Sequence, residues 1–299
     1  MKIISLCGKD FEERATVCAL GMFDGVHMGH RRIISAAKSI STELGIPTSV
    51  LIFSSSPHGS TELLPLSDRL TELKNAGADY AFVYDFDEIR EMSADDFITE
   101  LLCNELGVKG VAAGYNYRFG KGGNGDDKRL LELAKANGIK ATVCEEVDAF
   151  GEPVSSTRIR KLLMNGEIEM ANRLLTYPYY VNAPVLHGKE LGRRIGIPTI
   201  NQEIPSARAE MQKGIYYTKT YVDGREFLSV SNLGERPTVE NTAATNLETH
   251  ILDFDGDLYG KTVKVAFFGK GRPEQKFESV EELRREIMLD CERAREFFK

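Results

Sequence analysis

Two histidines lie three residues apart in the glycine-rich segment GMFDGVHMGH, residues 21–30. The segment falls between an apolar run and an amphipathic stretch, so it is expected to join a strand to a helix. His27 and His30 can then face one point beside the first turn of that helix, whose free N–H groups attract anions. Two imidazole donors in that place suit the charge that grows on a phosphoryl oxygen during transfer. We interpret the segment as a phosphate site.

Two other interpretations of residues 21–30 remain open. The segment can be an ordinary glycine turn that happens to hold two histidines. A His-x-x-His metal site is the weaker alternative, because no cysteine or carboxylate stands at a usual ligand spacing from the pair. The chain contains no G-x-x-x-x-G-K-[ST] motif, which excludes a Walker-type phosphate loop.

A second candidate phosphate site is VSSTRIR, residues 154–160, which opens a predicted helix. Ser155 or Ser156 can cap that helix. The first turns then offer a hydroxyl and two guanidinium groups, on Thr157, Arg158 and Arg160. Phosphate is the natural ligand of such groups near the positive end of a helix. An ordinary capped helix with solvated arginines is the alternative.

Neutral oxygen side chains mark a third segment, LGRRIGIPTIN at residues 191–201. Its two glycines and its proline argue against the interior of a strand, so we expect a loop wrapped around a ligand. Thr199 and Asn201 are two apart, which puts both side chains on one face of an extended segment. Their oxygens suit Mg²⁺, which keeps most of its waters and relies on substrate phosphates.

Glu248 lies in the strand-like segment NLETH, residues 246–250. It alternates with Leu247 and Thr249, so it shares a face with His250 and points into the mouth of a barrel if Leu247 is buried. A lone glutamate on a strand is more often solvated surface, and the spacing alone leaves that alternative open.

The first half of the chain alternates short apolar runs with amphipathic stretches, which predicts strands separated by single helices. We expect strands at 16–23, 47–53, 79–86, 108–114 and 140–147. We expect helices at 30–45, 67–77, 93–107 and 126–138, the second with Ser67 as its N-cap and Gly77 just past its end. Single-helix crossovers imply a mostly parallel, doubly wound α/β sheet, whose carboxyl edge is where ligands bind.

The pattern changes after about residue 176. Strand-like runs separated by turn signals follow at 214–222, 227–234, 247–254 and 261–268, which predicts a small closed β-barrel or a sandwich. A last helix is expected at 279–298, where Ser279 and Glu282 form a capping box. We place the boundary within residues 176–184 and therefore expect domains at 1–180 and 181–299.

Composition sets the class of protein. A chain of 299 residues, of which 42% are hydrophobic and 28% charged, fits two globular domains. Its net charge of −7 argues against non-specific nucleic-acid binding, although it is compatible with a local basic pocket for a phosphorylated small molecule. No apolar run reaches the ~20 residues of a membrane span, and the first residues lack the apolar core of a signal peptide. The five cysteines form no C-x-x-C pair, which suits a reducing cytoplasm.

Three segments of the first half resemble one family, in order. Residues 21–30 resemble the histidine signature of nucleotidyltransferases in the form used by FMN adenylyltransferases. Residues 154–160 resemble that family's later phosphate motif, and GYNYRFGKGGNGD at 114–126 resembles its glycine-rich loop for flavin and nucleotide. The resemblance implies a Rossmann-like nucleotidyltransferase fold and adenylyl transfer, in which the FMN phosphate attacks the α-phosphate of ATP and releases pyrophosphate. Such transfer needs positioning and electrostatics, with no covalent intermediate.

The same resemblance implies roles for individual residues. His27 and His30 would be catalytic. The residues that would bind ATP or its phosphates are Gly21, Phe23, Asp24, Gly25, Gly29, Ser156, Thr157, Arg158 and Arg160. Those that would bind the flavin are Asn116, Arg118 and Gly120.

The first half departs from the family pattern at three places. Asn116 and Tyr117 stand where the family usually has Asp and Phe, and the glycine-rich loop lacks a common arginine. The family's Phe-x-Pro-His-Pro signature is replaced by FSSSPHGS at 53–60. These changes concern His58 and the flavin contacts more than the histidine signature.

The second half resembles riboflavin kinases. GRRIGIPTIN at 192–201 is similar to the flavokinase Pro-Thr-Ala-Asn motif, with Ile200 in place of alanine, and GIYYTK, NLGERPTV, ETHILDFDGDLYG and RPEQKF follow in the family's order. The resemblance thus extends over the whole chain, to the bifunctional riboflavin kinase/FMN adenylyltransferases. The roles it implies are Mg²⁺-ATP binding by Thr199 and Asn201, proton removal from the ribityl 5′-hydroxyl by Glu248, and flavin binding by Arg272.

The leading hypothesis is an enzyme with two sites that converts riboflavin to FMN and FMN to FAD. A second hypothesis keeps the riboflavin kinase and makes the first domain a binding or structural module, and a third keeps only adenylyl transfer. An RNA-binding regulator is disfavoured by the net charge and by the lack of clustered aromatic and basic residues. We expect the small molecules riboflavin, FMN and ATP as substrates, with no nucleic-acid or membrane partner. The sequence does not indicate which oligomeric state the chain adopts.

Overall fold

The computed structural model describes residues 1–299 apart from 6–14, 56–60, 189–191, 193–195 and 237–243. Contacts between residues divide the chain into two compact units, Met1–Ser156 and Thr157–Lys299. Each unit has a six-stranded sheet of its own.

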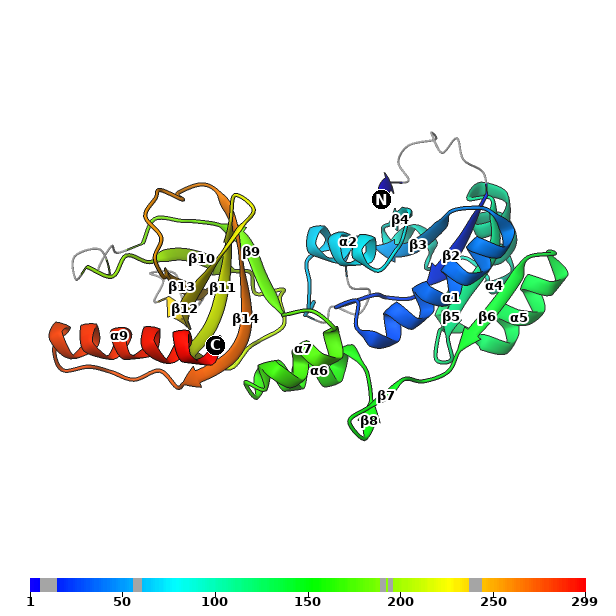
Figure 1. The fold of residues 1–299 in the computed structure, drawn as a ribbon. Coiled ribbons are helices and arrows are strands. Elements are labelled where there is room, and N and C mark those ends of the chain that lie inside the picture. The colour runs from blue at the N-terminus through cyan, green and yellow to red at the C-terminus, as the bar shows by residue number, and fades with distance from the viewer. Residues whose placement is uncertain (6–14, 56–60, 189–191, 193–195, 237–243) are drawn as a thin grey trace. The chain divides into compact units, whose positions relative to one another are not determined.

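The sheet of the first unit is parallel (Figure 1). Its strands are β1 (Lys2–Ser5), β2 (Thr16–Leu20), β3 (Thr48–Phe53), β4 (Tyr80–Tyr84), β5 (Val108–Gly114) and β6 (Lys140–Cys144). They lie in the order β1-β4-β3-β2-β5-β6, and every neighbouring pair is parallel. This confirms the predicted α/β fold. The sequence does not predict β1, because a strand of four residues is too short to show a period.

Helices cover both faces of this sheet (Figure 1). They are α1 (Met28–Leu44), α2 (Leu66–Asn75), α3 (Phe86–Ile89), α4 (Ala94–Asp96), the π-helical η1 (Phe97–Glu105), the 3₁₀ turn η2 (Lys121–Gly123) and α5 (Asp127–Ala136). A small hairpin of β7 (Asp148–Ala149) and β8 (Glu152–Pro153) follows β6. The predicted N-cap at Ser67 is wrong: Pro65, with a φ of −62°, is the N-cap residue of α2, so Ser67 lies within the first turn.

Each face of the parallel sheet carries an apolar core. Alternate residues of β2 supply both: Val17 and Ala19 pack with α1, whereas Cys18 and Leu20 pack with η1 and α5. This alternation is what a strand between two helical layers requires, and it holds the carboxyl end of β2 rigidly at the edge of the sheet.

The second unit begins with two helices and continues as a nearly closed antiparallel barrel (Figure 1). The helices are α6 (Ser156–Met164) and α7 (Ile168–Leu175); the strands are β9 (Tyr180–Pro184), β10 (Ile200–Ile204), β11 (Gly214–Val222), β12 (Arg225–Arg236), β13 (Ala244–Ile251) and β14 (Thr262–Arg272). Their order is β10-β13-β12-β11-β14-β9, and a bridge between Leu186 and Asn201 brings the two ends together. The barrel is therefore confirmed over the sandwich, and α9 (Val280–Phe297) packs on its outside.

The interior of the barrel holds a layer of hydroxyl groups. Thr218 contacts Ser231 at 2.8 Å, and Ser231 contacts Thr249 at 2.8 Å, all fully buried. With Leu247 and Thr249 inside, Glu248 and His250 share the outer face, as predicted. Glu248 is exposed on that face, where residues of α9 lie nearby.

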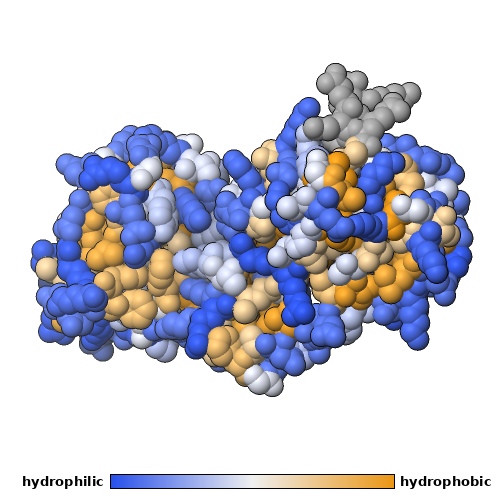
Figure 2. Space-filling model, turned by 45° about the vertical axis from the view of Figure 1, so that its right-hand side comes forward, coloured by the Kyte–Doolittle hydropathy of each residue, from blue (hydrophilic) through white to orange (hydrophobic). Residues whose placement is uncertain are grey.

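No helix among the described residues is both long and apolar enough to cross a membrane. Figure 2 shows hydrophilic residues over much of one face of the molecule, with apolar patches between them.

Candidate active sites

The histidine turn, which we define as residues 21–30, joins β2 to α1. β2 ends at Leu20, earlier than predicted, and His27 is the N-cap residue of α1. Its Nδ1 accepts a hydrogen bond from the backbone N–H of His30 at 3.4 Å, and the two rings stack with their centroids 3.7 Å apart. The structure thus brings the two predicted catalytic histidines together at the N-terminus of a 17-residue helix.

The backbone of the histidine turn is strained. Phe23 and Val26 have φ angles of 50° and 41°, in the left-handed region that favours glycine, and Gly25 has a φ of 79°. Phe23 is fully buried and lies against Gly21. A Cβ on Gly29 would lie 3.2 Å from the His27 ring, so the absence of a side chain there gives the imidazole its room.

Burial controls the charge of the two histidines. It lowers the pKa of His27 to about 4. It also lowers the pKa of His30 well below the usual value, with the neighbouring His27 and Arg69 acting in the same direction. At neutral pH both rings are therefore uncharged N–H donors. Because Nδ1 of His27 accepts a hydrogen bond, its proton sits on Nε2.

The predicted VSSTRIR site begins beside the histidine turn. The Ser156 hydroxyl donates to the backbone carbonyl of Asp24 at 2.8 Å. Ser156 is the first residue of α6, and the predicted phosphate ligands that follow on this helix belong to the second unit. Of these, Thr157 is exposed, whereas Arg158 and Arg160 are half-buried.

The glycine-rich loop follows β5, which is the parallel neighbour of β2. Both strands therefore end at the same edge of the sheet. Asn116 and Arg118 are exposed there. Phe119 is buried and packs in the apolar core, which anchors the loop to the sheet. Gly120 has a φ of 71°, and a Cβ on it would lie 2.7 Å from the backbone nitrogen of Ala94, so only glycine fits. His58 lies outside the described residues.

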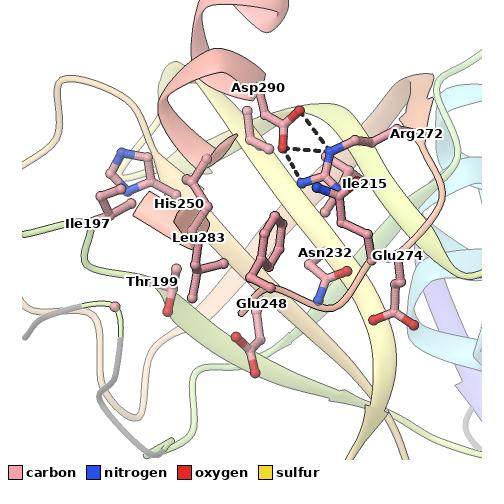
Figure 3. Close-up of a pocket in the computed structure, with 15 residues that line it drawn as sticks. Ile197, Thr199, Ile215, Asn232, Glu248, His250, Arg272, Glu274, Leu283 and Asp290 are labelled. Atoms are coloured by element: carbon pink, nitrogen blue, oxygen red, sulfur yellow. Dashed lines mark hydrogen bonds and ion pairs between the residues drawn. The ribbon is translucent and has the colours of Figure 1, made fainter. Parts of the chain in front are cut away.

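A second candidate site is a cavity of about 230 Å³ between the outer face of the barrel and α9. Figure 3 shows side chains that line it from the segment before β10, from strands of the barrel, from the segment after β14 and from α9. The polar and charged members of the lining are Thr199, Asn232, Glu248, His250, Arg272, Glu274, Gln275 and Asp290. Apolar side chains such as Phe277 and Leu283 complete it, so the cavity suits a ligand with one flat apolar part and several polar groups.

The predicted metal ligands are linked to Glu248 by a residue that the sequence analysis missed. Asn246 donates from Nδ2 to Oδ1 of Asn201 at 3.3 Å and to Oε1 of Glu248 at 3.1 Å. The spacing Asn-x-Glu on a predicted strand was the available signal, since it puts both side chains on one face.

The segment that carries Thr199 is tied to the same strand. The His250 ring contacts the carbonyl oxygen of Pro198 through Nδ1 at 2.7 Å. The described residues hold no group of three or more His, Cys, Asp or Glu side chains that could bind a metal ion. Neutral oxygens of Thr199 and Asn201 beside one carboxylate nevertheless fit Mg²⁺, which shares its coordination with substrate phosphates.

An ion pair fixes Arg272 at the wall of the cavity. Its Nη2 lies 2.7 Å and its Nε 3.1 Å from Oδ2 of Asp290, whose side chain is only 2% exposed (Figure 3). Asp290 comes from α9, so the pair also holds this helix on the barrel. The sequence gives no signal for Asp290, because it lies one position before the apolar stripe residue Cys291.

Comparisons with known proteins cover both units. The FAD synthetase family model matches residues 9–158, and the riboflavin kinase (flavokinase) family model matches residues 175–298. A "Bifunctional riboflavin kinase/FMN adenylyltransferase" from Listeria monocytogenes is 36% identical over 94% of this chain and 92% of its own. Proteins of the same name from Escherichia coli and Pseudomonas fluorescens are 35% and 34% identical, over 96% and 95% of this chain and 94% and 93% of their own.

The chain belongs to the bifunctional riboflavin kinase/FMN adenylyltransferase family. It is accordingly an enzyme with an FAD synthetase domain and a riboflavin kinase domain. A solved structure described as a macrolide-efflux protein from Streptococcus pneumoniae has the same fold, with a TM-score of 0.88, 26% identity and 99% coverage of both chains. A shared fold does not establish an activity. The family assignment is based on the matching family models and sequence relatives.

Proposed function

We propose that residues 181–299 phosphorylate riboflavin to FMN and that residues 1–180 adenylylate FMN to FAD, with ATP as the donor in both reactions. The observation that best supports the first reaction is the cavity between barrel and α9, which holds Glu248 beside Thr199. The second is supported by the paired neutral histidines at the N-terminus of α1. We also propose that the enzyme works in the cytoplasm on small-molecule substrates.

In the kinase reaction, Glu248 would accept the proton of the ribityl 5′-hydroxyl as that oxygen attacks the γ-phosphate of ATP. The Asn246 amide occupies Oε1 of Glu248 and leaves Oε2 for the substrate. Thr199 and Asn201 would hold the Mg²⁺ of Mg²⁺-ATP, and that ion, when bound, supplies positive charge to the phosphates. Arg272 would contact the flavin, oriented by Asp290.

In the adenylyl transfer, the chain positions two substrates and stabilises charge. Neutral His27 and His30 would donate N–H groups to oxygens of the reacting phosphates, together with the free N–H groups of the first turn of α1. The glycines of the histidine turn, Gly21, Gly25 and Gly29, let the backbone approach the nucleotide, and Phe23 and Asp24 hold its shape. Ser156, Thr157, Arg158 and Arg160 remain predicted phosphate ligands, and Asn116, Arg118 and Gly120 remain predicted flavin ligands.

A monofunctional kinase whose first domain only binds flavin is not favoured, because the FAD synthetase family model matches residues 9–158. One experiment separates the possibilities. The purified chain is incubated with riboflavin, ATP and Mg²⁺, and riboflavin, FMN and FAD are separated by chromatography. We expect FMN to appear first and FAD to follow. FMN without FAD would reject the adenylylation, and FAD only from added FMN would reject the kinase.

A further inference from the structure

Arg69 of α2 is the largest nearly fully buried side chain among the described residues, with 1% of its surface exposed. Burying a guanidinium group is costly unless partners compensate for the lost water. Arginine nevertheless stays protonated in proteins, so a permanent positive charge lies inside the first unit.

Hydrogen bonds compensate for only part of the desolvation cost of the Arg69 guanidinium. Nη2 of Arg69 donates to the backbone carbonyl of Phe53 at 2.7 Å, at the end of β3. Nε is buried and has no hydrogen-bond partner. Two carboxylates, those of Glu62 and Asp24, act on the charge from nearby and oppose the effect of burial on the pKa of Arg69.

The same region is tied to the histidine turn. The backbone N–H groups of Leu63 and Leu64 donate to Oδ1 of Asp24 at 2.8 and 3.5 Å, and α2 begins at the second residue after them. β2 and β3 are parallel neighbours, so their ends lie at one edge of the sheet. Arg69 therefore lies between the end of β3 and the histidine turn. Nδ1 of His30, like Nε of Arg69, is buried without a hydrogen-bond partner.

We propose that Arg69 is a positioning residue for adenylyl transfer, a permanent buried cation that fixes the histidine turn against β3 and places a fixed positive charge near His30. This inference rests on the function proposed for the histidine turn. Burial, His27 and Arg69 all lower the pKa of His30, whereas the charges of Glu62 and Asp24 oppose the lowering of the pKa of Arg69 by burial. The charge is thus provided without any proton uptake by the histidines.

The experiment compares R69Q and R69K in the full-length chain. FAD formation from FMN and ATP is followed as a function of pH, and riboflavin phosphorylation is measured on the same samples. For R69Q we expect kcat for FAD formation to fall about 10- to 100-fold, as for a lost charge-stabilising group. The KM values should change less, and the acid limb of the pH profile should move to higher pH because His30 protonates more easily. R69K keeps the charge and should recover most of the rate.

R90Q is the matched control, since Arg90 is an arginine of the same unit with 55% of its side chain exposed. It should behave as the wild type in both reactions. Folded R69Q with the wild-type rate and pH profile would overturn the proposal, and so would folded R69K that is as slow as R69Q.

A measurement on the wild type decides the matter if the variants do not fold. The imidazole signals are titrated by NMR, with His30 assigned through its loss in H30Q. We expect His30 to stay neutral throughout the pH range of activity, and a protonated His30 at neutral pH would refute the proposal. A wild-type chain that makes no FAD would instead refute the function of the histidine turn, while the NMR titration would still report on Arg69.

Discussion

Glu248 of β13 lies directly opposite Asn201 of β10 in the antiparallel pairing of these strands. On its other side Glu248 pairs with Asn232 of β12. A single carboxylate therefore stands between two carboxamides on the outer face of the barrel, and Asn246 adds a third beside it. These carboxamides can orient the carboxylate by hydrogen bonds, as Asn246 does at Oε1.

Glu248→Gln should separate the two reactions. Glutamine keeps the size of the side chain and loses its basicity, so FMN formation should fall by roughly 10²- to 10⁴-fold. Riboflavin and ATP should still bind, and FAD formation from added FMN should continue. Both rates are measured on the same preparation. Retained kinase activity would contradict the role as base, and loss of both reactions would indicate a folding defect.

Thr199→Ala and Asn201→Ala should raise the concentrations of Mg²⁺ and ATP needed for half-maximal FMN formation. Each change removes one oxygen from the expected surroundings of the metal. Titrations of Mg²⁺ at fixed riboflavin measure the effect. Wild-type activity of both variants at limiting Mg²⁺ would reject the assignment.

His27→Ala and His30→Ala should each lower FAD formation by at least ~100-fold, because a positioned donor to the phosphoryl oxygens is lost. FMN formation should hardly change, since its predicted residues lie in the barrel domain. Steady-state assays of the two reactions provide the comparison. If both variants make FAD at the wild-type rate, the adenylyl-transfer site lies elsewhere.

The buried His27 should make the first unit less stable in acid. The unfolded chain protonates this imidazole below about pH 6.5, whereas the folded chain, with a pKa of about 4, does not. Because the unfolded state binds more protons in this window, the free energy of unfolding falls as pH drops through it, by about 3 kcal/mol at most. His27→Gln removes this contribution. Denaturant unfolding of both proteins at neutral pH and near pH 4.5 should show a smaller acid loss in the variant; equal losses would contradict the buried neutral state.

Asp290→Asn should weaken flavin binding and the packing of α9 together. It removes the buried carboxylate that pairs with Arg272 and leaves only Glu286, whose Oε1 lies 3.7 Å from Nε of Arg272, as an acidic partner. The KM for riboflavin should rise more than kcat falls, since Arg272 loses its fixed orientation. Asp253→Asn is the control, because it breaks an exposed pair with Arg295 of the same helix, worth about 0–1 kcal/mol. Equal effects of the two variants would argue against a special role for Asp290.

The sequence predicts most of the fold because its periods are clear. The run at 214–222 coincides with β11, and Gly45 ends α1 with a φ of 66°, as a helix-terminating glycine should. The strands that escape prediction are β1, β7, β8, β9 and β10. Each is short, and β10 follows a segment rich in glycine whose irregular pattern hides the strand that begins at Ile200.

Some residues of the candidate sites could be predicted from the sequence and others could not. Residues near one another in the chain, such as His27 and His30, are predictable because local geometry alone brings them together. Arg69 and Asp290 are not, because their importance comes from burial against distant segments. A sequence does not distinguish a surface residue from a buried one of the same type. Only the packing of α2 shows that Arg69 is buried, and only the packing of α9 shows that Asp290 is.

The hydroxyl layer inside the barrel also bears on how the enzyme responds to cold. Exposing apolar surface on unfolding raises the heat capacity, whereas exposing polar surface lowers it. A barrel that buries Thr218, Ser231 and Thr249 should therefore gain less heat capacity per residue on unfolding than the α/β unit with its two apolar cores. Its stability curve is expected to be flatter. The barrel unit should then keep its fold at temperatures where the α/β unit has already begun to lose its hydrophobic driving force.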